Sequence, residues 1–166
     1  LPLHGRYQTT NLAVAVAATE ALLARQLDAT ALADGISVVT SPGRLEQFGE
    51  DPLVLLDGAH NADGFAALAS ALEGEYPSFR WVLVVGAMMD KDLATMLPAL
   101  SGRVVSVIAT RIDSERAVPA DQLATFASNL LRVHAEAVSD PVEAVERAKQ
   151  IAGEGGSVLV TGSLYL

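Results

Sequence analysis

The residues best suited to chemistry follow a short apolar run in the first half of the chain. Residues 53–56 are apolar without a break, and Asp57, His60 and Asn61 come within the next five positions. An aspartate at the end of a strand can accept hydrogen bonds from the hydroxyls of a ribose, and it can equally cap the next helix. His60 can donate to a phosphate or a carboxylate, although a single histidine is more often structural. Asn61 is most simply the N-cap of the following helix.

Three more polar segments carry cationic or hydroxyl side chains. Arg44 follows Pro42-Gly43, and its planar guanidinium suits stacking or bidentate anion binding, although an ordinary surface arginine is the simpler interpretation. Lys91 lies between two aspartates, where it can meet an anion at a helix start or be a solvated charge of a capped helix. Ser163 belongs to a Thr-Gly-Ser segment that follows the last apolar run. Each of these signals is weak alone.

The elements that carry these side chains can bring them together. Apolar runs typical of buried strands alternate with helix-period patterns along the chain. We expect strands at 44–48, 53–56, 80–85, 104–109, 134–138 and 157–160. We expect helices at 12–26, 29–36, 62–73, 90–100, 119–131 and 141–152, the first capped by Thr10 or Asn11 and the fourth opened by an acidic cap.

This alternation predicts the α/β class, with a mostly parallel sheet of about six strands and helices on both faces. The loops that follow parallel strands share the carboxyl edge of the sheet, which is where open α/β folds bind ligands. We therefore expect the loops after 53–56, 80–85 and 157–160 to form one site.

Composition limits the class of protein. The chain has 166 residues, of which 51% are hydrophobic and 19% charged, so we expect one globular domain. It has no cysteine, which excludes disulfides and thiolate metal sites. The net charge of -9 argues against a nucleic-acid groove, and no apolar run reaches the ~18 residues of a membrane span.

Several common site motifs are absent. The chain has no phosphate-binding Gly-x-x-x-x-Gly-Lys-[Ser/Thr] loop and no Gly-x-Gly-x-x-Gly after a strand, and its three histidines offer no zinc pattern. A nucleotide-using enzyme normally carries a phosphate loop. We interpret residues 1–10 as an incoming linker and the chain as a piece of something longer, because it opens without Met and ends directly after a strand.

The polar segments together resemble a known family. They are similar to the motifs of the folylpolyglutamate synthase branch of the Mur ligase family, in family order and spacing: Gly5-Arg-Tyr-Gln8-Thr-Thr-Asn11, Gly43-Arg44-Leu-Glu46, Asp57-Gly-Ala-His60-Asn61, Asp90-Lys91-Asp92 and Thr161-Gly-Ser163-Leu-Tyr165. Five short motifs in register cover the chain from end to end. One departure is Ala62, where the family usually has Pro; Pro there only presets the first helical turn, so the resemblance stands.

The resemblance implies a Rossmann-like, three-layer Mur ligase C-terminal domain spanning 1–166. Enzymes of this family use ATP to phosphorylate a carboxylate of a folate, and the amine of L-glutamate then attacks the acyl phosphate. Many bacterial members also join glutamate to dihydropteroate, so a dihydrofolate synthase activity is open. A separate N-terminal ATPase domain, absent from this chain, carries the phosphate loop and binds most of the Mg²⁺. The resemblance thus implies a cytoplasmic monomer with no nucleic-acid or membrane partner, and a fragment that is folded but inactive alone.

Residue roles also follow from the resemblance. Asn11 would hydrogen-bond the adenine side of ATP, Arg44 would contact the nucleotide across the interdomain cleft, and Asp57 would bind the ribose hydroxyls. His60 would lie near the phosphates and the incoming glutamate, with Lys91 and Ser163 as weaker candidates for glutamate handling. No residue of this chain is expected to bind a metal directly.

Two alternatives remain open. The chain could belong to another Mur-type ligase that joins an amino acid to a cell-wall or storage-polymer precursor. It could also be a non-catalytic nucleotide-binding or interaction module with a degenerate site. Arg44, Asp57 and His60 are all present, which argues against degeneracy.

Overall fold

Strands and helices alternate along most of the chain in the computed structural model, which describes residues 1–163 and 165–166. The strands are β1 (Glu46–Glu50), β2 (Leu53–Leu56), β3 (Trp81–Val85), β4 (Val104–Ala109), β5 (His134–Ala137) and β6 (Ser157–Thr161). The helices are α1 (Tyr7–Leu23), α2 (Ala29–Ser37), α3 (Ala62–Glu75), α4 (Leu93–Met96), the 3₁₀ helix η1 (Leu97–Leu100), α5 (Ala120–Leu131) and α6 (Pro141–Ala152).

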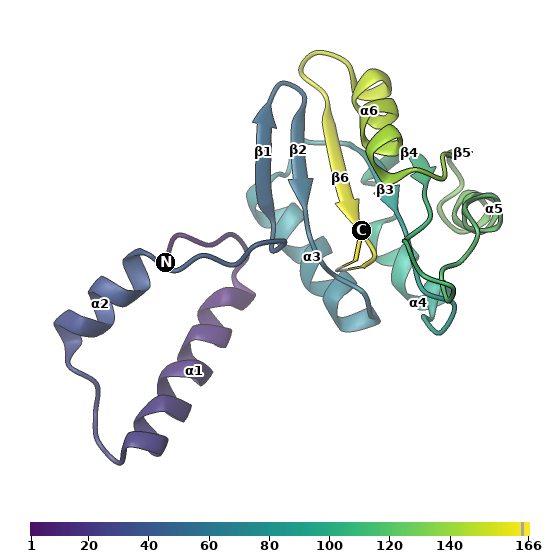
Figure 1. The fold of residues 1–166 in the computed structure, drawn as a ribbon. Helices are drawn as coiled ribbons and strands as arrows, with labels where there is room; N and C mark the ends of the chain where they lie inside the picture. Colours follow the sequence, from purple (N-terminus) through teal and green to yellow (C-terminus); the bar gives the residue numbers. More distant parts are fainter. Residues whose placement is uncertain (164) are drawn as a thin grey trace.

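The six strands form one sheet in the order β1-β2-β6-β3-β4-β5 (Figure 1). Strand β1 runs antiparallel to β2, and every other neighbouring pair is parallel. The predicted mostly parallel sheet is therefore confirmed. Because β6 lies between β2 and β3, the loops that leave these three strands share one edge, as the sequence predicted.

The two faces of the sheet bury different helices. Alternate strand residues such as Leu55, Leu83 and Leu159 pack with α3, α4, η1 and α5 in the larger core cluster. Their neighbours, such as Val84 and Val158, face the other way and pack mainly against Ala144 and Ala148 of α6. Strands with apolar residues on both faces need helices on both sides of the sheet, which explains the continuous apolar runs in the sequence.

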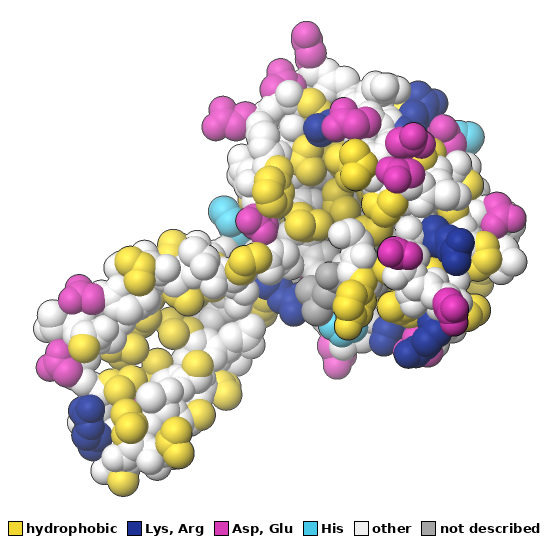
Figure 2. Space-filling view, in the orientation of Figure 1, with side chains coloured by type: hydrophobic (Ala, Val, Ile, Leu, Met, Phe, Trp, Pro, Cys, Tyr) yellow, Lys and Arg dark blue, Asp and Glu magenta, His cyan; other side chains and the backbone are white. Residues whose placement is uncertain are grey.

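Helices α1 and α2 project from the sheet domain as a two-helix arm, residues 7–37 (Figure 1). Gln8 is the buried residue of α1, and α2 has none. Apolar side chains remain exposed on the arm (Figure 2). Val14 is 64% exposed and Leu22 is 85% exposed. The arm therefore gains little stability from the core.

Three of the differences between predicted and observed elements have a clear physical reason. Helix α1 begins at Tyr7, so Thr10 and Asn11 lie inside the helix and do not cap it. Strand β1 begins at Glu46, two residues later than predicted, because the backbone of Leu45 has a positive φ of 47° that a strand does not allow.

The third difference is in the predicted helix 90–100. It is a single α-helical turn, capped by Asp92, that continues as a 3₁₀ helix. Pro98 lacks the N–H that a longer α-helix would need at that position.

Candidate functional site

The carboxylate of Asp57, just after β2, bonds to the loop that precedes β1. This side chain follows β2 and is 3% exposed. Its Oδ2 accepts a hydrogen bond from the backbone N–H of Leu45 at 3.0 Å, and its Oδ1 accepts one from the N–H of Ala59 at 2.8 Å. The N–H of Gly58 also donates to the carbonyl oxygen of Gly43 at 2.7 Å. The segment before β1 is therefore fixed against the segment after β2.

The backbone of this loop requires unusual conformations. Gly43 has a φ of 68° and Leu45 a φ of 47°, both in the left-handed region. The N–H of Gly43 donates to the carboxylate of Glu46 at 2.8 Å, and the Leu45 side chain is fully buried. A non-glycine residue holds a left-handed conformation only when its surroundings compensate the cost, and these contacts do so.

Arg44 is carried between these two anchored residues and is partly exposed. Within residues 1–163 and 165–166, its guanidinium forms no ion pair. Its positive charge nevertheless reaches Asp57, where it offsets part of the rise in pKa that burial causes. The structure thus brings together two of the residues that the sequence singled out, and it leaves the arginine head available to an anion.

The pKa of Asp57 is raised, and burial is the main cause. The backbone N–H groups of Ala59 and Leu45 act in the opposite direction, followed by the charge of Arg44 and the hydroxyl of Tyr7. Desolvation disfavours the carboxylate, whereas donors and cations favour it. Asp57 does not cap α3, because the side chain of Asn61 accepts from Gly64 N–H at 2.8 Å and forms the predicted N-cap.

Tyr7 belongs to this cluster, although the sequence reasoning did not select it. The side chain is partly buried, and its pKa is raised to about 12, mainly by burial and next by the negative charge of Asp57. The clue in the sequence was its place between Gly5 and Gln8 of the first motif. Tyr7 therefore brings the first turn of the arm within reach of the charge of Asp57.

Asn11 lies one helical turn after Tyr7, and side chains four residues apart share one side of a helix. The Asn11 side chain is exposed, and its amide donates to Oε1 of the buried Gln8 at 3.2 Å. Asn11 therefore follows Tyr7 along α1, and Tyr7 is the residue of this helix on which the charges of Asp57 and Arg44 act.

His60 is oriented by its own loop. Its Nδ1 lies 2.8 Å from the carbonyl oxygen of Gly58, which can only accept, so Nδ1 carries the proton of this hydrogen bond. In the neutral ring, Nε2 is therefore an acceptor, and it donates to an anion only when the ring is protonated. The start of α3 is also a poor anion site, because Asn61 already caps it and Asp63 places a negative charge in its first turn.

Lys91 and Ser163 lie in loops at the same edge but are engaged locally. Lys91 Nζ is 3.3 Å from Oδ2 of Asp90, whose Oδ1 is 3.0 Å from Arg116 Nη2. The hydrogen bond from Lys91 is the main reason why the pKa of Asp90 is lowered. Ser163 is 7% exposed, and its Oγ accepts from the N–H of Tyr165 at 3.1 Å.

The edge loops are also tied to one another through their backbones. The N–H of Gly162 donates to the carbonyl oxygen of Ala59 at 3.0 Å, and the N–H of Gly86 donates to that of Thr161 at 3.4 Å. The Thr-Gly-Ser segment therefore links the loop after β2 to the loop after β3. This confirms the prediction that the three loops share one edge.

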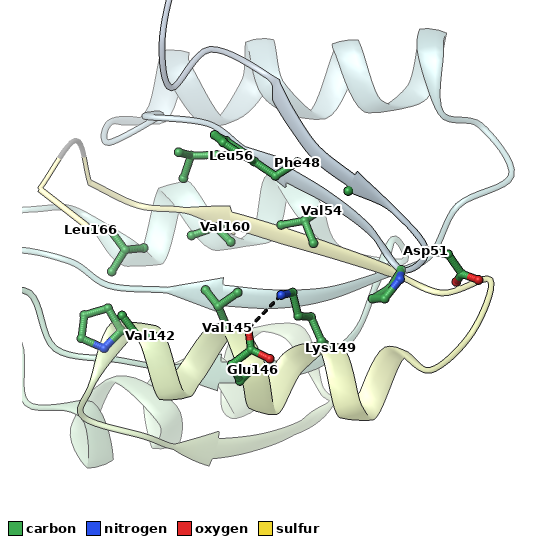
Figure 3. Close-up of a pocket in the computed structure, with 13 residues that line it drawn as sticks. Phe48, Asp51, Val54, Leu56, Val142, Val145, Glu146, Lys149, Val160 and Leu166 are labelled. Carbon is green, nitrogen blue, oxygen red and sulfur yellow. Dashed lines mark hydrogen bonds and ion pairs between the residues drawn. The ribbon is translucent and has the colours of Figure 1, made fainter.

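A mostly apolar groove lies elsewhere, between β1, β2, β6 and α6 (Figure 3). Its volume is about 520 Å³, and Phe48, Val54, Val142, Val145 and Leu166 are among the side chains that line it. It is lined by none of the six residues predicted for the site.

Two further features are absent from the described part of the chain. No group of three or more His, Cys, Asp or Glu side chains there comes together to hold a metal ion. The described helices include none that is long and apolar enough to cross a membrane.

Comparison with known proteins gives a consistent picture. Residues 43–164 match the model of the Mur ligase, glutamate ligase domain. The dihydrofolate synthase/folylpolyglutamate synthase of Mycobacterium tuberculosis is 42% identical over 132 residues, which are 76% of this chain and 27% of that protein. A probable bifunctional folylpolyglutamate synthase/dihydropteroate synthase of Haloferax volcanii is 38% identical over 171 residues, 100% of this chain and 20% of that protein. The chain thus spans about a quarter or less of the length of these relatives.

A solved structure extends the likeness to the arm. Mycobacterium tuberculosis folylpolyglutamate synthase complexed with ADP and AMPPCP superimposes with a TM-score of 0.90 at 35% identity, covering 98% of this chain and 39% of that one. Coverage of 98% must include most of residues 1–42, which precede the match to the family model. The arm and the sheet domain therefore have a similar relative placement in both proteins.

Proposed function

The chain belongs to the Mur ligase family, and from that membership we propose that it is the C-terminal, nucleotide- and glutamate-contacting domain of an ATP-dependent folylpolyglutamate synthase. The observation that carries this proposal is the fixed pairing of the Arg44 loop with Asp57 at the carboxyl edge of the sheet. The names of the two relatives and of the solved structure, which holds ADP and AMPPCP, support the same function.

The proposed reaction forms an amide in two steps. A carboxylate oxygen of the folate attacks the γ-phosphorus of ATP, the bond to the β,γ-bridging oxygen breaks, and ADP leaves. The amine of L-glutamate then attacks the acyl carbon, the amide bond forms, and inorganic phosphate leaves as the amine loses a proton. Phosphorylation is needed because an unactivated carboxylate has no good leaving group. Phosphorylation also brings several negatively charged groups together in the site, and cations must offset this charge.

In this proposal, Asn11, Arg44 and Asp57 bind the nucleotide. The Asp57 carboxylate accepts two backbone N–H groups and lies near the Tyr7 hydroxyl, and it has one further acceptor position that a ribose hydroxyl could use. The free guanidinium of Arg44 is suited to stack on the base or pair with a phosphate. Asn11, one turn from Tyr7, is proposed to bind the adenine.

His60 is proposed to act near the reacting groups. With Nδ1 bound to the Gly58 carbonyl, Nε2 of the neutral ring can accept a proton from the attacking amine. Lys91 and Ser163 remain the weaker proposals for glutamate handling, because Lys91 already pairs with Asp90 and Ser163 is buried.

We assign Mg²⁺ to another part of the whole protein. The described residues include no cluster of three potential ligands, so no step is assigned to a metal held here. The proposal places Mg²⁺ and the phosphate loop on the N-terminal ATPase domain of the whole protein, which would be the partner of this domain. A cytoplasmic location and a monomeric state are part of the same proposal, and a dihydrofolate synthase activity is its open extension.

The test uses the full-length protein. We expect ATP-dependent addition of L-glutamate to a folate, followed as ADP release that requires both acceptor and glutamate. Arg44→Ala should raise KM for ATP tenfold or more, about 1.4 kcal/mol or more of lost nucleotide binding. The matched control is Arg25→Ala, an exposed arginine on the arm, which should leave KM unchanged.

Other outcomes would point to the alternatives. ADP release that requires a cell-wall or storage-polymer precursor in place of a folate would assign the chain to another Mur-type ligase. Unchanged full-length activity after Asp57→Ala would support a non-catalytic module and refute the role of Asp57.

A further inference from the structure

The residues that precede α1 are held against the sheet domain by the carboxylate of Glu75, at the end of α3. Glu75 Oε1 accepts from the backbone N–H of Gly5 at 2.6 Å, and Oε2 lies 2.8 Å from Nδ1 of His4. Both contacts join residues 70 or more positions apart, and the Glu75 side chain is 32% exposed. The Glu75 carboxylate therefore contacts two consecutive residues just before α1.

An aromatic cluster packs beside the contacts of Glu75 with His4 and Gly5. The ring centroid of His4 lies 6.2 Å from that of Tyr76, and Tyr76 meets the fully buried Trp81 edge to face at 5.8 Å. Phe79 stacks on Trp81 at 5.7 Å. Because Trp81 begins the central strand β3, the entry of the chain is anchored to the core and not only to the surface.

The conformation of Gly5, which Glu75 contacts, sets the geometry of the first turn of α1. Gly5 has a φ of 89°, and the Tyr7 ring occupies the space that a Cβ at Gly5 would need. The N–H of Gln8 donates to the carbonyl oxygen of Gly5 at 3.0 Å. Beyond Gln8, α1 buries no residue, so its direction depends on this first turn.

Two carboxylates of the sheet domain hold the segments that lead into and out of the arm. Glu75 holds its entry at residues 4–5, and Asp57 holds its exit at Leu45. We propose that Glu75 is a positioning residue of the nucleotide site: it holds the first turn of α1 so that Asn11 stands beside the loop of Arg44 and Asp57. This rests on the proposed function only in so far as Asn11 and Arg44 bind a nucleotide.

A loss of positioning has a predictable size. If the arm samples many directions, only the molecules whose arm has the binding direction can bind ATP. The affinity for ATP then falls in proportion to that fraction of molecules. A competent fraction of about one in ten raises KM for ATP about tenfold, and it leaves the chemical step unchanged once ATP is bound.

The first experiment measures arm direction in this 166-residue chain without nucleotide. Because the chain has no cysteine, spin labels can be attached at Ala18→Cys on the arm and Gln122→Cys on α5, both exposed. We expect a narrow distance distribution in the labelled parent and a broad one after Glu75→Ala. Glu75→Gln should stay narrow, since its carbonyl oxygen can still accept from Gly5 and its amide can donate to His4.

The matched control is Glu73→Ala. Glu73 lies on the same helix, but it faces Arg103 at 3.6 Å and is 77% exposed. It should leave the distance distribution unchanged. A distribution that is as narrow in Glu75→Ala as in the parent overturns the proposal.

The second experiment measures steady-state kinetics of the full-length synthase. Glu75→Ala should raise KM for ATP about tenfold with kcat and KM for glutamate near the parent values, and Glu75→Gln should restore KM. An unchanged KM for ATP overturns the positioning role even if the arm has become mobile. A parent enzyme with no ATP-dependent activity would instead refute the proposed function, and the distance measurement would still decide whether Glu75 holds the arm.

Discussion

The backbone N–H of Leu45 donates to the carboxylate of Asp57 across twelve residues of chain, at 3.0 Å and away from solvent. This bond holds a left-handed leucine in place and presents the neighbouring Arg44 at the carboxyl edge of the sheet. The aspartate that the sequence marked as a ribose ligand is therefore also a structural support for the arginine beside it. Its ligand role remains a prediction.

Asp57→Ala should destabilise the chain by about 2 kcal/mol or more, because two buried N–H groups, those of Leu45 and Ala59, lose their acceptor. Asp57→Asn should cost less, since one carbonyl oxygen remains. The measurement is urea unfolding, with Asp34→Ala on the exposed face of α2 as control, expected within about 0.5 kcal/mol of the parent. Equal stability of the Asp57→Ala and Asp34→Ala chains would contradict this account.

Gly162→Ala should destabilise the chain by about 1–3 kcal/mol more than Gly102→Ala. Both glycines have a positive φ, 110° and 77°, so both substitutions impose backbone strain. A Cβ at Gly162 would press against the carbonyl oxygen of Gly86, whereas one at Gly102 would meet no atom within 4 Å. Thermal or urea unfolding of the two variants isolates the steric part, and equal losses would show that β6 and β3 can separate at this edge without cost.

Tyr7 should ionise with a pKa of about 12, above its ordinary value of 10.0. Because the folded state favours the neutral phenol, the stability that Tyr7 contributes is complete below pH 10 and is lost as pH rises towards 12. Tyrosinate absorbance followed against pH should show a last step near pH 12 that Tyr7→Phe removes. Tyr165→Phe, at a residue that is 76% exposed, should leave that step in place. Persistence of the step in Tyr7→Phe would place the group elsewhere.

Much of the fold could be predicted because its signals are local. Apolar runs such as residues 53–56 and 81–85 are typical of strands covered on both faces, and the helical patterns between them favour parallel crossovers. Asn61 was predicted as the N-cap of α3 for the same reason, since a cap bonds within its own first turn. The limits of α1 and β1 were missed because contacts of Gly5 and Leu45 with distant residues set them.

The sequence by itself determined the order of strands and helices, the motifs of the Mur ligase family and the common edge of their loops, because periodicity and short-range spacing are properties of neighbouring residues. Only the tertiary structure decided that Asp57 turns inward to Leu45, that Tyr7 joins it, and that Glu75 grips His4 and Gly5. A carboxylate that loses contact with water, fully at Asp57 and partly at Glu75, must find donors wherever the folded chain brings them, and no local pattern specifies a partner 12 or 70 residues away.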